Sequence, residues 1–532
     1  MVRKAQSAVP KSFNALVLLA VLLVGACSSG TSSDRSANDA PEGILRIGVE
    51  RPQSLDPAQA RSPSEFLLAE QLFDGLTTFD PVTHQAQPAV AASWESSPDM
   101  KAWNFTIRPD AKFGNGRPIT ADDVKYTLER IARKGSQSPA ATQLELIGGF
   151  KPFNITGKAA NLAGVVVPAP NVVHIAVDQP LAVLPEILGN PMYGIVPREA
   201  VEAQAPSPPF DVQPVGSGPF VLQSRTETVL HLVPAPDRNV TLRGVDAYMA
   251  RDPAGSYAAF LRGGLDWAEV PPDQVEPVPE KRGRDTFGPY AAELFYGFNL
   301  KNPKFKDQRF RQAIVQAIDR EAIVRLVYGG SVRPSSGLVA DGVPGYQPNA
   351  CGDRCAYNPE RARQLVAEAF GGKPPPQIQI DFDDNPTQSA VAQAMQANLR
   401  DVGIPSALRP HPYGDYLRFA LGGQQELFRL GWIGSHPSPD AFLTPLFQSG
   451  MSDNITGFSS PPVDQLLSRA RAEPDPQKRF ATYQEAEKLV MDQVPVLPIA
   501  QFQIHTVVST RVENLNMSIL GTFDASQVRL TG

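Results

Sequence analysis

The sequence contains few of the residues from which metal sites and nucleophilic sites are built. Of its 532 residues, only six are histidine and three are cysteine. The histidines are dispersed and show no metal-ligand spacing; they are His84, His174, His231, His411, His436 and His505. We therefore expect no cofactor and no directly bound metal. His436 is interpreted as a histidine of an exposed loop.

Motifs of hydrolases and nucleotide-binding enzymes are also missing. The sequence has no H-E-x-x-H, no G-x-S-x-G and no phosphate loop ending in G-K-[ST]. Glycines flank Ser217 directly instead of standing two residues away, which favours a tight turn over a nucleophile. The acidic residues Asp381, Asp383 and Asp384 lack the glycine and distal glutamate of a calcium loop. We interpret them as a solvated strand end and predict no catalytic residues.

Length, proline content and charge limit the class of protein further. A chain of 532 residues is longer than a single hydrophobic core usually organises, so two or three domains are expected. The 52 prolines are about twice the average usage, which favours long ordered connections. The net charge of −6 becomes −9 when residues 1–26, with three basic and no acidic side chains, are removed. Such a surface argues against nucleic acid as a partner.

The N-terminus reads as an export signal. Arg3, Lys4 and Lys11 precede an apolar run over 15–26 that is too short to span a bilayer but suits a signal peptide. Val24 to Cys27 resembles a bacterial lipobox, which implies that Cys27 carries a lipid. The polar residues that follow are expected to form a flexible tether to about residue 42. We predict a protein outside the cytoplasm, anchored to the membrane through Cys27.

The two other cysteines, Cys351 and Cys355, stand four positions apart. In an oxidising compartment a short disulfide is the favoured interpretation, and two free thiols are the alternative. Zinc is not expected, because no further histidine or cysteine lies near this pair.

The clearest local pattern runs from Pro88 to Ile131. Trp103, Phe105 and Ile107 alternate with polar residues, which predicts a strand with one buried face. Asn115-Gly116 then predicts a tight turn. Thr120 stands three residues before Asp123 and just ahead of an apolar stripe, so a capped helix should follow.

This region also resembles a known family. The run A-x-S-W-E, S-P-D, F-x-I-R and A-K-F-x-N-G-R-P-I-T-A-D-D-V is similar to the signature of the peptide/nickel class of ABC-transporter solute-binding proteins, the oligopeptide- and dipeptide-binding family 5. S-L-D-P at 54–57, L-F-D-G-L at 72–76 and the helix-like phrase at 307–320 resemble the same family.

The resemblance implies an α/β, two-lobed periplasmic-binding-protein-like fold of type II, with an additional inserted subdomain. It implies a discontinuous lobe I at 43–75, 192–293 and 503–532, an inserted subdomain at 76–191, and lobe II at 294–502, after a signal peptide at 1–26 and a lipidated tether at 27–42. A monomer is expected. No enzyme activity is implied, since the receptor only captures a solute and delivers it to the membrane permease.

The resemblance places the ligand along residues 427–435, L-F-R-L-G-W-I-G-S. The residues expected to contact a peptide or peptide-like ligand are Tyr413, Arg429, Gly431, Trp432, Ile433 and Ser435. As a strand, this segment would point Arg429 to one face and Trp432 to the other. Arg429 could instead pair with a nearby acid, and Trp432 could be a core residue.

One departure from the family affects specificity. Many peptide binders carry an aspartate shortly after this tryptophan, which pairs with the ligand's α-ammonium, but here Ser435 stands there. Asp440 is the first candidate to replace it. Two alternatives therefore stay open: binding of a non-peptide solute, or an envelope lipoprotein that acts through a protein partner.

Overall fold

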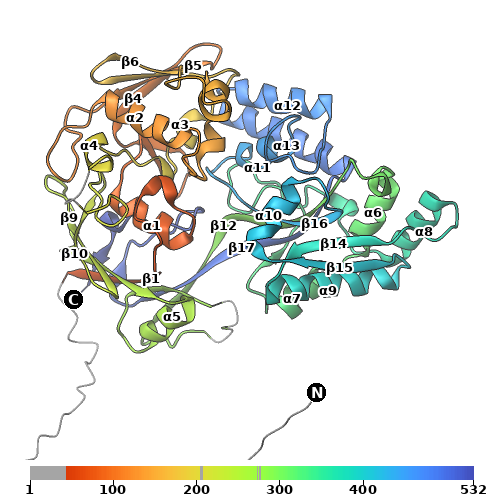
Figure 1. Ribbon diagram of the computed structural model, residues 1–532. Coiled ribbons are helices and arrows are strands. Elements are labelled where there is room, and N and C mark those ends of the chain that lie inside the picture. Colours follow the sequence, from red (N-terminus) through yellow and green to blue (C-terminus); the bar gives the residue numbers. More distant parts are fainter. Residues whose placement is uncertain (1–42, 204–207, 272–273, 275–276, 532) are drawn as a thin grey trace, which may run out of the picture. The chain divides into compact units, whose positions relative to one another are not determined.

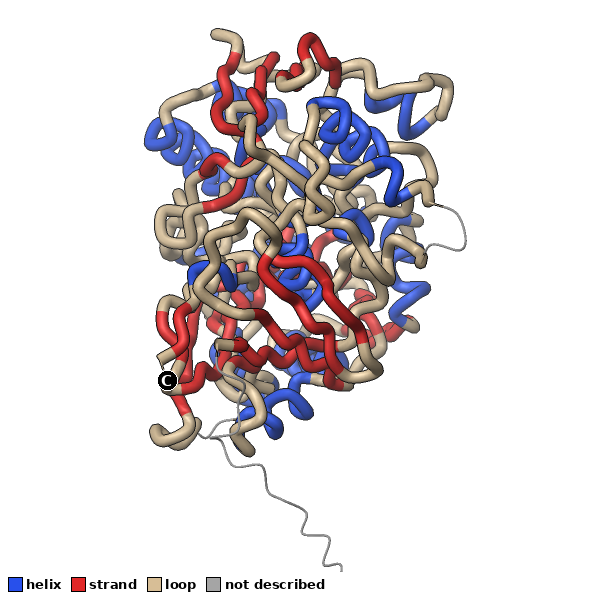
Figure 2. The backbone as a smooth tube through the Cα atoms, turned by 90° about the vertical axis from the view of Figure 1, so that its left-hand side faces the viewer, coloured by secondary structure: helices blue, strands red, loops and turns tan. Residues whose placement is uncertain are grey.

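A computed structural model describes residues 43–203, 208–271, 274 and 277–531. The predicted signal peptide, Cys27 and the tether lie outside these residues. The described chain is a mixed α/β structure, in which long loops join the helices and strands (tan in Figure 2). This agrees with the predicted fold class and with the high proline content.

The largest sheet has 11 strands, in the order β15-β14-β16-β12-β17-β11-β1-β10-β9-β8, with β13 paired to β17. Their bounds are β1 Ile44–Glu50, β8 Phe220–Arg225, β9 Val229–Pro234, β10 Gly244–Ala250, β11 Trp267–Glu269, β12 Gly283–Phe298, β13 Arg333–Pro334, β14 Ile378–Asp383, β15 Ser406–His411, β16 Leu427–Ile433 and β17 Val496–Ser509. The long strands β12 and β17 are antiparallel neighbours, as Figure 1 shows. One end of β12 pairs with β17 only, and the other end also pairs with β16.

A second sheet has the order β4-β5-β7-β6, and two further pairs are β2-β3 and β18-β19. Their bounds are β2 Thr77–Phe79, β3 Ala86–Pro88, β4 Ala91–Ser96, β5 Ala102–Ile107, β6 Val165–Ala169, β7 Val172–Ala176, β18 Val512–Glu513 and β19 Arg529–Leu530. The helices are α1 Pro63–Leu72, α2 Ala121–Ala132, α3 Leu184–Ile187, α4 Arg198–Val201, α5 Pro253–Leu261, α6 Gln308–Ala317, α7 Arg320–Val327, α8 Pro359–Phe370, α9 Pro386–Asp401, α10 Tyr413–Leu421, α11 Asp440–Phe447, α12 Pro461–Ala472 and α13 Pro476–Gln493.

The predicted strand is β5 of this second sheet, and the predicted turn and helix follow it along the chain. Trp103, Phe105 and Ile107 of β5 are buried, as their alternation predicts. Gly116 has φ +85°, a value that suits glycine in a tight turn. Helix α2 begins directly after Thr120, whose N–H and hydroxyl both donate to the Asp123 carboxylate, at 2.8 and 2.9 Å. The cap therefore comes mainly from Asp123 reaching back.

Three large groups of buried apolar side chains hold the chain together. Core 1 extends over residues 291–520, and core 2 over residues 58–195. Core 3 combines residues 45–73 and 196–267 with the C-terminal segment 508–528, and it also takes in Tyr126. Core 3 is thus assembled from segments at both ends of the chain.

A buried ion-pair cluster joins the segments of core 3. The Asp266 carboxylate is fully buried and accepts from Arg46 and Arg511, with Nη2 to oxygen distances of 2.9 and 2.7 Å. Burial alone would raise the pKa of Asp266, but hydrogen bonds from Arg511 and Arg46 outweigh it, so the pKa lies below its usual value. These three residues fix strand β1 to the C-terminal segment.

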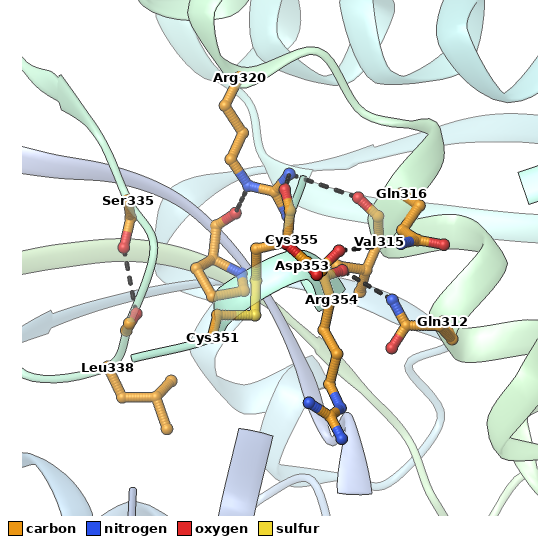
Figure 3. The surroundings of a disulfide bond; sticks show 12 residues. Gln312, Val315, Gln316, Arg320, Ser335, Leu338, Cys351, Asp353, Arg354 and Cys355 are labelled. Atoms are coloured by element: carbon orange, nitrogen blue, oxygen red, sulfur yellow. Dashed lines mark hydrogen bonds between the residues drawn. A yellow bond between two sulfur atoms is a disulfide. The ribbon is translucent and has the colours of Figure 1, made fainter. Parts of the chain in front are cut away.

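The structure joins Cys351 and Cys355 by a disulfide (Figure 3). The loop that it closes supplies a carbonyl to a buried cation: Arg320 donates to the Cys355 carbonyl oxygen at 2.7 Å and to that of Pro498 at 2.6 Å. Closing so short a loop contributes at most about 2 kcal/mol by the chain-entropy relation. The bond therefore acts locally, by shaping the loop that accepts from Arg320.

The prediction that Asp381 and Asp383 form a solvated strand end is wrong. Asp381 and Asp383 are 0% and 3% exposed, because β14 lies between β15 and β16. Arg409 on β15 pairs with Asp381, and Arg429 on β16 pairs with Asp383. Each carboxylate faces a guanidinium on a neighbouring strand, which offsets part of the cost of burying its charge.

Candidate functional site

Strand β16 has an edge that is partly open. The Gly434 N–H donates to the Ala291 carbonyl at 2.7 Å, so in antiparallel register with β12 the peptide groups of Arg429, Gly431 and Ile433 point away from β12. On that side, β14 pairs only with Leu427 and Phe428. Among the described residues, no further strand covers this edge, so the peptide groups of Gly431 and Ile433 can bind an added strand.

Trp432 and Ser435 border a cavity of about 220 Å³. The Trp432 indole packs against core 1, and its Nε1 donates to the Ala441 carbonyl at 2.7 Å. Ile433 lines the same cavity and is 50% exposed. The Ser435 carbonyl accepts from Asn190 Nδ2 at 2.6 Å. Both interpretations of Trp432 thus apply, since it borders the cavity and is anchored to the core.

The opposite wall of this cavity comes from core 2. Glu145 follows a short 3-10 helix at Ala141–Leu144, and Ile187 ends α3. The segments of cores 1 and 2 also meet through an ion pair between Glu186 and Arg479, at 3.3 Å. The cavity therefore lies where residues of two cores face each other.

Arg429 is paired with an acid of the protein. Its Nη1 atom lies 3.2 Å from Asp383 Oδ1, and its side chain is 21% exposed. The hydroxyl of Tyr416, on α10, donates to the Arg429 carbonyl at 2.5 Å. In this structure Arg429 therefore pairs with a nearby acid, as the alternative interpretation predicted. An anionic ligand would have to compete with Asp383.

Asp440, the candidate to replace the missing aspartate, belongs to an internal network. Its Oδ1 accepts from Thr444 Oγ1 at 2.6 Å and from the Tyr483 hydroxyl at 2.7 Å, and Arg471 lies 3.6 Å away. Asp440 is 5% exposed. These partners all contact Oδ1 and tie α11 to α13, while Asp440 also lines the cavity and its Oδ2 accepts no hydrogen bond from the described residues.

The interpretation of His436 as an exposed loop residue is wrong. Its side chain is 3% exposed and lines the cavity. Nδ1 lies 3.0 Å from Ser435 Oγ, and Nε2 is buried without a hydrogen-bond partner among the described residues. Burial lowers the pKa of His436 to about 4, with Asp440 opposing the shift. The imidazole is therefore neutral at physiological pH.

Arg429 and Gly431 belong to β16 itself, and neither they nor Tyr413 line this cavity. Tyr413 begins α10 and is 67% exposed. Among the described residues that line the cavity, Trp432, Ile433 and Ser435 are the predicted ones. The structure thus brings Trp432, Ile433 and Ser435 to the cavity, leaves Arg429 and Gly431 elsewhere on β16, and places Tyr413 at the start of α10.

A second cavity of about 740 Å³ is lined by Tyr328, Gln388, Glu269 and, from β17, Phe502 and Ile504. Burial, with a further contribution from Glu50, raises the pKa of Glu269 to about 6. Sequence analysis did not single out these residues, because an apolar strand such as β17 gives no sign of facing a cavity.

Two carboxylates of the 220 Å³ cavity were also missed. Glu145 and Asp453 are separated by more than 300 positions and belong to no recognisable motif. Burial raises the pKa of Glu145 to about 7, with a further rise from the charge of Asp453. Only the folded chain shows that they approach each other.

No metal or membrane site is evident in the part of the chain that the structure describes. Within 43–203, 208–271, 274 and 277–531, no group of three or more His, Cys, Asp or Glu side chains is arranged to hold a metal ion. In the same ranges, no helix has both the length and the apolar character needed to span a bilayer.

The fold, the strand edge and the cavity between cores are those of a solute receptor, and comparison with known proteins identifies the family. Residues 85–454 match the family described as "Bacterial extracellular solute-binding proteins, family 5 Middle". The match covers more than half of the chain, and the protein belongs to this family. The predicted family and the expectation of a binder without enzyme activity are confirmed.

Known proteins resemble the chain over most of its length. It is 27% identical over 475 residues to the periplasmic murein peptide-binding protein MppA of Escherichia coli (strain K12), covering 86% of this chain and 87% of that protein. It is 25% identical over 507 residues to the oligopeptide-binding protein OppA of Bacillus subtilis (strain 168), covering 91% and 92%. An unliganded open form of MppA superposes with a TM-score of 0.75 at 25% identity, covering 92% of this chain and 98% of that one.

Proposed function

We propose that this protein is the peptide-binding component of an ABC importer, which captures a short peptide in the cleft beside β16 and delivers it to the membrane permease. The single observation that carries the proposal is the unpaired edge at Gly431 and Ile433, next to a cavity for a side chain. An extended peptide can add to such an edge through main-chain hydrogen bonds that any sequence supplies. The names of the relatives, MppA and OppA, support peptide as the ligand class.

We also propose the lobe division given above. The buried clusters support it, since core 3 draws on both ends of the chain, core 2 on residues 58–195 and core 1 on residues 291–520. A ligand between cores would contact both and so favour the state in which they are close.

Peptide binding is tested by calorimetry with trialanine and N-acetyl-trialanine. We expect both to bind, with affinities within about tenfold, roughly 1.4 kcal/mol. Ser435, at the position where the family resemblance implies an aspartate, cannot neutralise an ammonium, and Oδ1 of Asp440 already accepts from Thr444 and Tyr483. Loss of binding on acetylation would show that an acid does hold the α-ammonium. Failure of both peptides to bind would overturn the proposed function.

We propose that Cys27 anchors the protein by a lipid, which the sequence Val24 to Cys27 supports. Cys27→Ala is expected to move the protein from the membrane fraction to the soluble fraction without changing its melting temperature, because the tether separates the anchor from the fold. Cell fractionation measures the first effect and thermal unfolding the second. Retention of the variant in the membrane fraction would contradict the proposal.

A further inference from the structure

The 220 Å³ cavity next to Ser435 is lined by two carboxyl groups that have no side-chain partner among the described residues. Glu145 enters it from the core 2 side, and Asp453 enters from the loop between α11 and α12. Neither carboxylate has a hydrogen bond or ion pair to another side chain of the described chain. The positive charges of Lys151 and Arg471 lessen the rise in the pKa of Glu145 but do not cancel it. Two carboxylates held this way repel each other and gain by accepting a cation between them.

An independent observation at the same cavity also indicates a missing donor. The His436 side chain is 97% buried, as its 3% exposure shows, and its Nε2 atom has no hydrogen-bond partner. The nearest acid, Asp440, is 4.0 Å away, too far for a hydrogen bond. Burying a polar atom without a hydrogen-bond partner costs free energy unless a ligand or a water molecule supplies the hydrogen bond. The cavity that Glu145 and Asp453 line therefore also contains a buried ring nitrogen without a hydrogen-bond partner among the described residues.

The shape of the lining distinguishes between two kinds of cation. Leu146, Ile187 and Ile433 supply apolar surface to the cavity that the carboxylates also line. Lysine and arginine side chains combine an apolar stem with a charged end, so they match a cavity with both kinds of wall. A peptide α-ammonium has no such stem and does not match the apolar part of the wall.

We propose that this cavity is a specificity pocket for a basic side chain of the bound peptide, with Glu145 and Asp453 as the residues that recognise its charge. The inference rests on the proposed peptide-binding function and goes beyond it by assigning the pocket and its ligand class. Glu145 comes from core 2 and Asp453 from core 1, so the bound cation joins the two. Recognition of the basic side chain therefore also favours the closed state, in which the two cores are close.

The test is calorimetry with trialanine and with three lysine tripeptides, each carrying lysine at a different position, against the same peptides with norleucine in place of lysine. Norleucine keeps the stem and removes the charge. For the unaltered protein, we expect lysine to bind at least tenfold tighter than norleucine at one position. Glu145→Gln and Asp453→Asn should each reduce this ratio several-fold. Glu321→Gln, which alters an exposed carboxylate at the start of α7, serves as the control and should retain the full ratio.

The outcomes separate the two proposals. If trialanine binds but lysine and norleucine are equal at all three positions, the pocket inference is wrong and peptide binding stands. The inference is also wrong if Glu145→Gln and Asp453→Asn abolish the affinity difference between free and N-acetylated peptide but not the difference between lysine and norleucine. The cation that the two carboxylates recognise would then be the α-ammonium. If no peptide binds, the proposed function fails and the pocket inference fails with it. Thermal unfolding of each variant confirms that it is folded, and the two single variants serve as independent tests.

Discussion

Replacement of Asp266 by alanine is expected to lower the free energy of unfolding by about 3 to 5 kcal/mol. The substitution leaves Arg46 and Arg511 without their shared carboxylate in a place where the aspartate side chain is fully buried. It also breaks the link between strand β1 and the C-terminal segment. Urea unfolding at neutral pH, followed by circular dichroism, measures the change.

The matched control is Asp341→Ala. Asp341 pairs with Arg333 at 2.8 Å, a distance similar to those at Asp266, but the two side chains are 36% and 59% exposed. An exposed pair of this kind contributes less than about 1 kcal/mol. Equal losses in the two variants would contradict the reasoning from burial. Because the folded pKa of Asp266 is lowered, its contribution is present above the usual aspartate range and is lost as pH falls through the folded pKa.

The second large effect concerns Glu487, a buried carboxyl of core 1. Its Oε1 accepts from the N–H groups of Leu338 and Val339, at 2.6 and 3.1 Å, and the side chain is 1% exposed. Burial raises its pKa from 4.5 to about 7, although these two hydrogen bonds act in the opposite direction. Glu293, close by, accepts from Ser335 Oγ at 2.8 Å, and burial raises its pKa as well.

The sign of the pH dependence follows from the raised pKa. Between pH 4.5 and about 7 the folded protein holds a proton that the unfolded chain releases, so stability falls as pH rises through this range, by about 3 kcal/mol for Glu487. Glu487→Gln keeps the acceptor oxygen and removes the titration. We expect the variant to match the unaltered protein at pH 4 and to exceed it by up to about 3 kcal/mol at pH 8.

The control for this prediction is Glu485→Gln on the same helix, α13. Glu485 pairs with Arg469 at 2.8 Å, and both side chains are 62% exposed. Its substitution should change the free energy of unfolding by less than about 1 kcal/mol at either pH. A Glu487→Gln variant that is less stable than the unaltered protein at pH 8 would show that the carboxylate is needed in its charged form.

Local patterns in the sequence predicted the elements that depend on neighbouring residues. The alternation at Trp103, Phe105 and Ile107 gives β5, and the segment at 427–435 contains strand β16, which ends at Ile433. Periodicity reports which face of an element is buried, so such elements can be predicted from one sequence. The resemblance to a family then supplied the arrangement of the elements, which periodicity does not contain.

What could not be predicted depends on contacts between distant segments. Asp381 was interpreted as solvated although β14 lies between two other strands, and His436 as exposed although it faces distant residues of core 2 across a cavity. Glu145 and Asp453 lie in different cores, and nothing in the residues around either indicates the other. In each case the chemistry of a polar side chain was set by a partner that the local sequence does not identify.

The composition of core 3 has a consequence for the order of folding. Strand β1 is among the first segments to leave the ribosome, yet Arg46 shares Asp266 with Arg511, and the core includes residues up to Val528. Chains are synthesised from the N-terminus and domains generally fold as units, so core 3 is completed only when nearly all of the chain has been synthesised. Core 1, drawn from one continuous stretch, is mostly available earlier. Strand β1 can pair with β10 once residue 250 has been synthesised, but the part of core 3 that packs on the C-terminal segment forms only at the end.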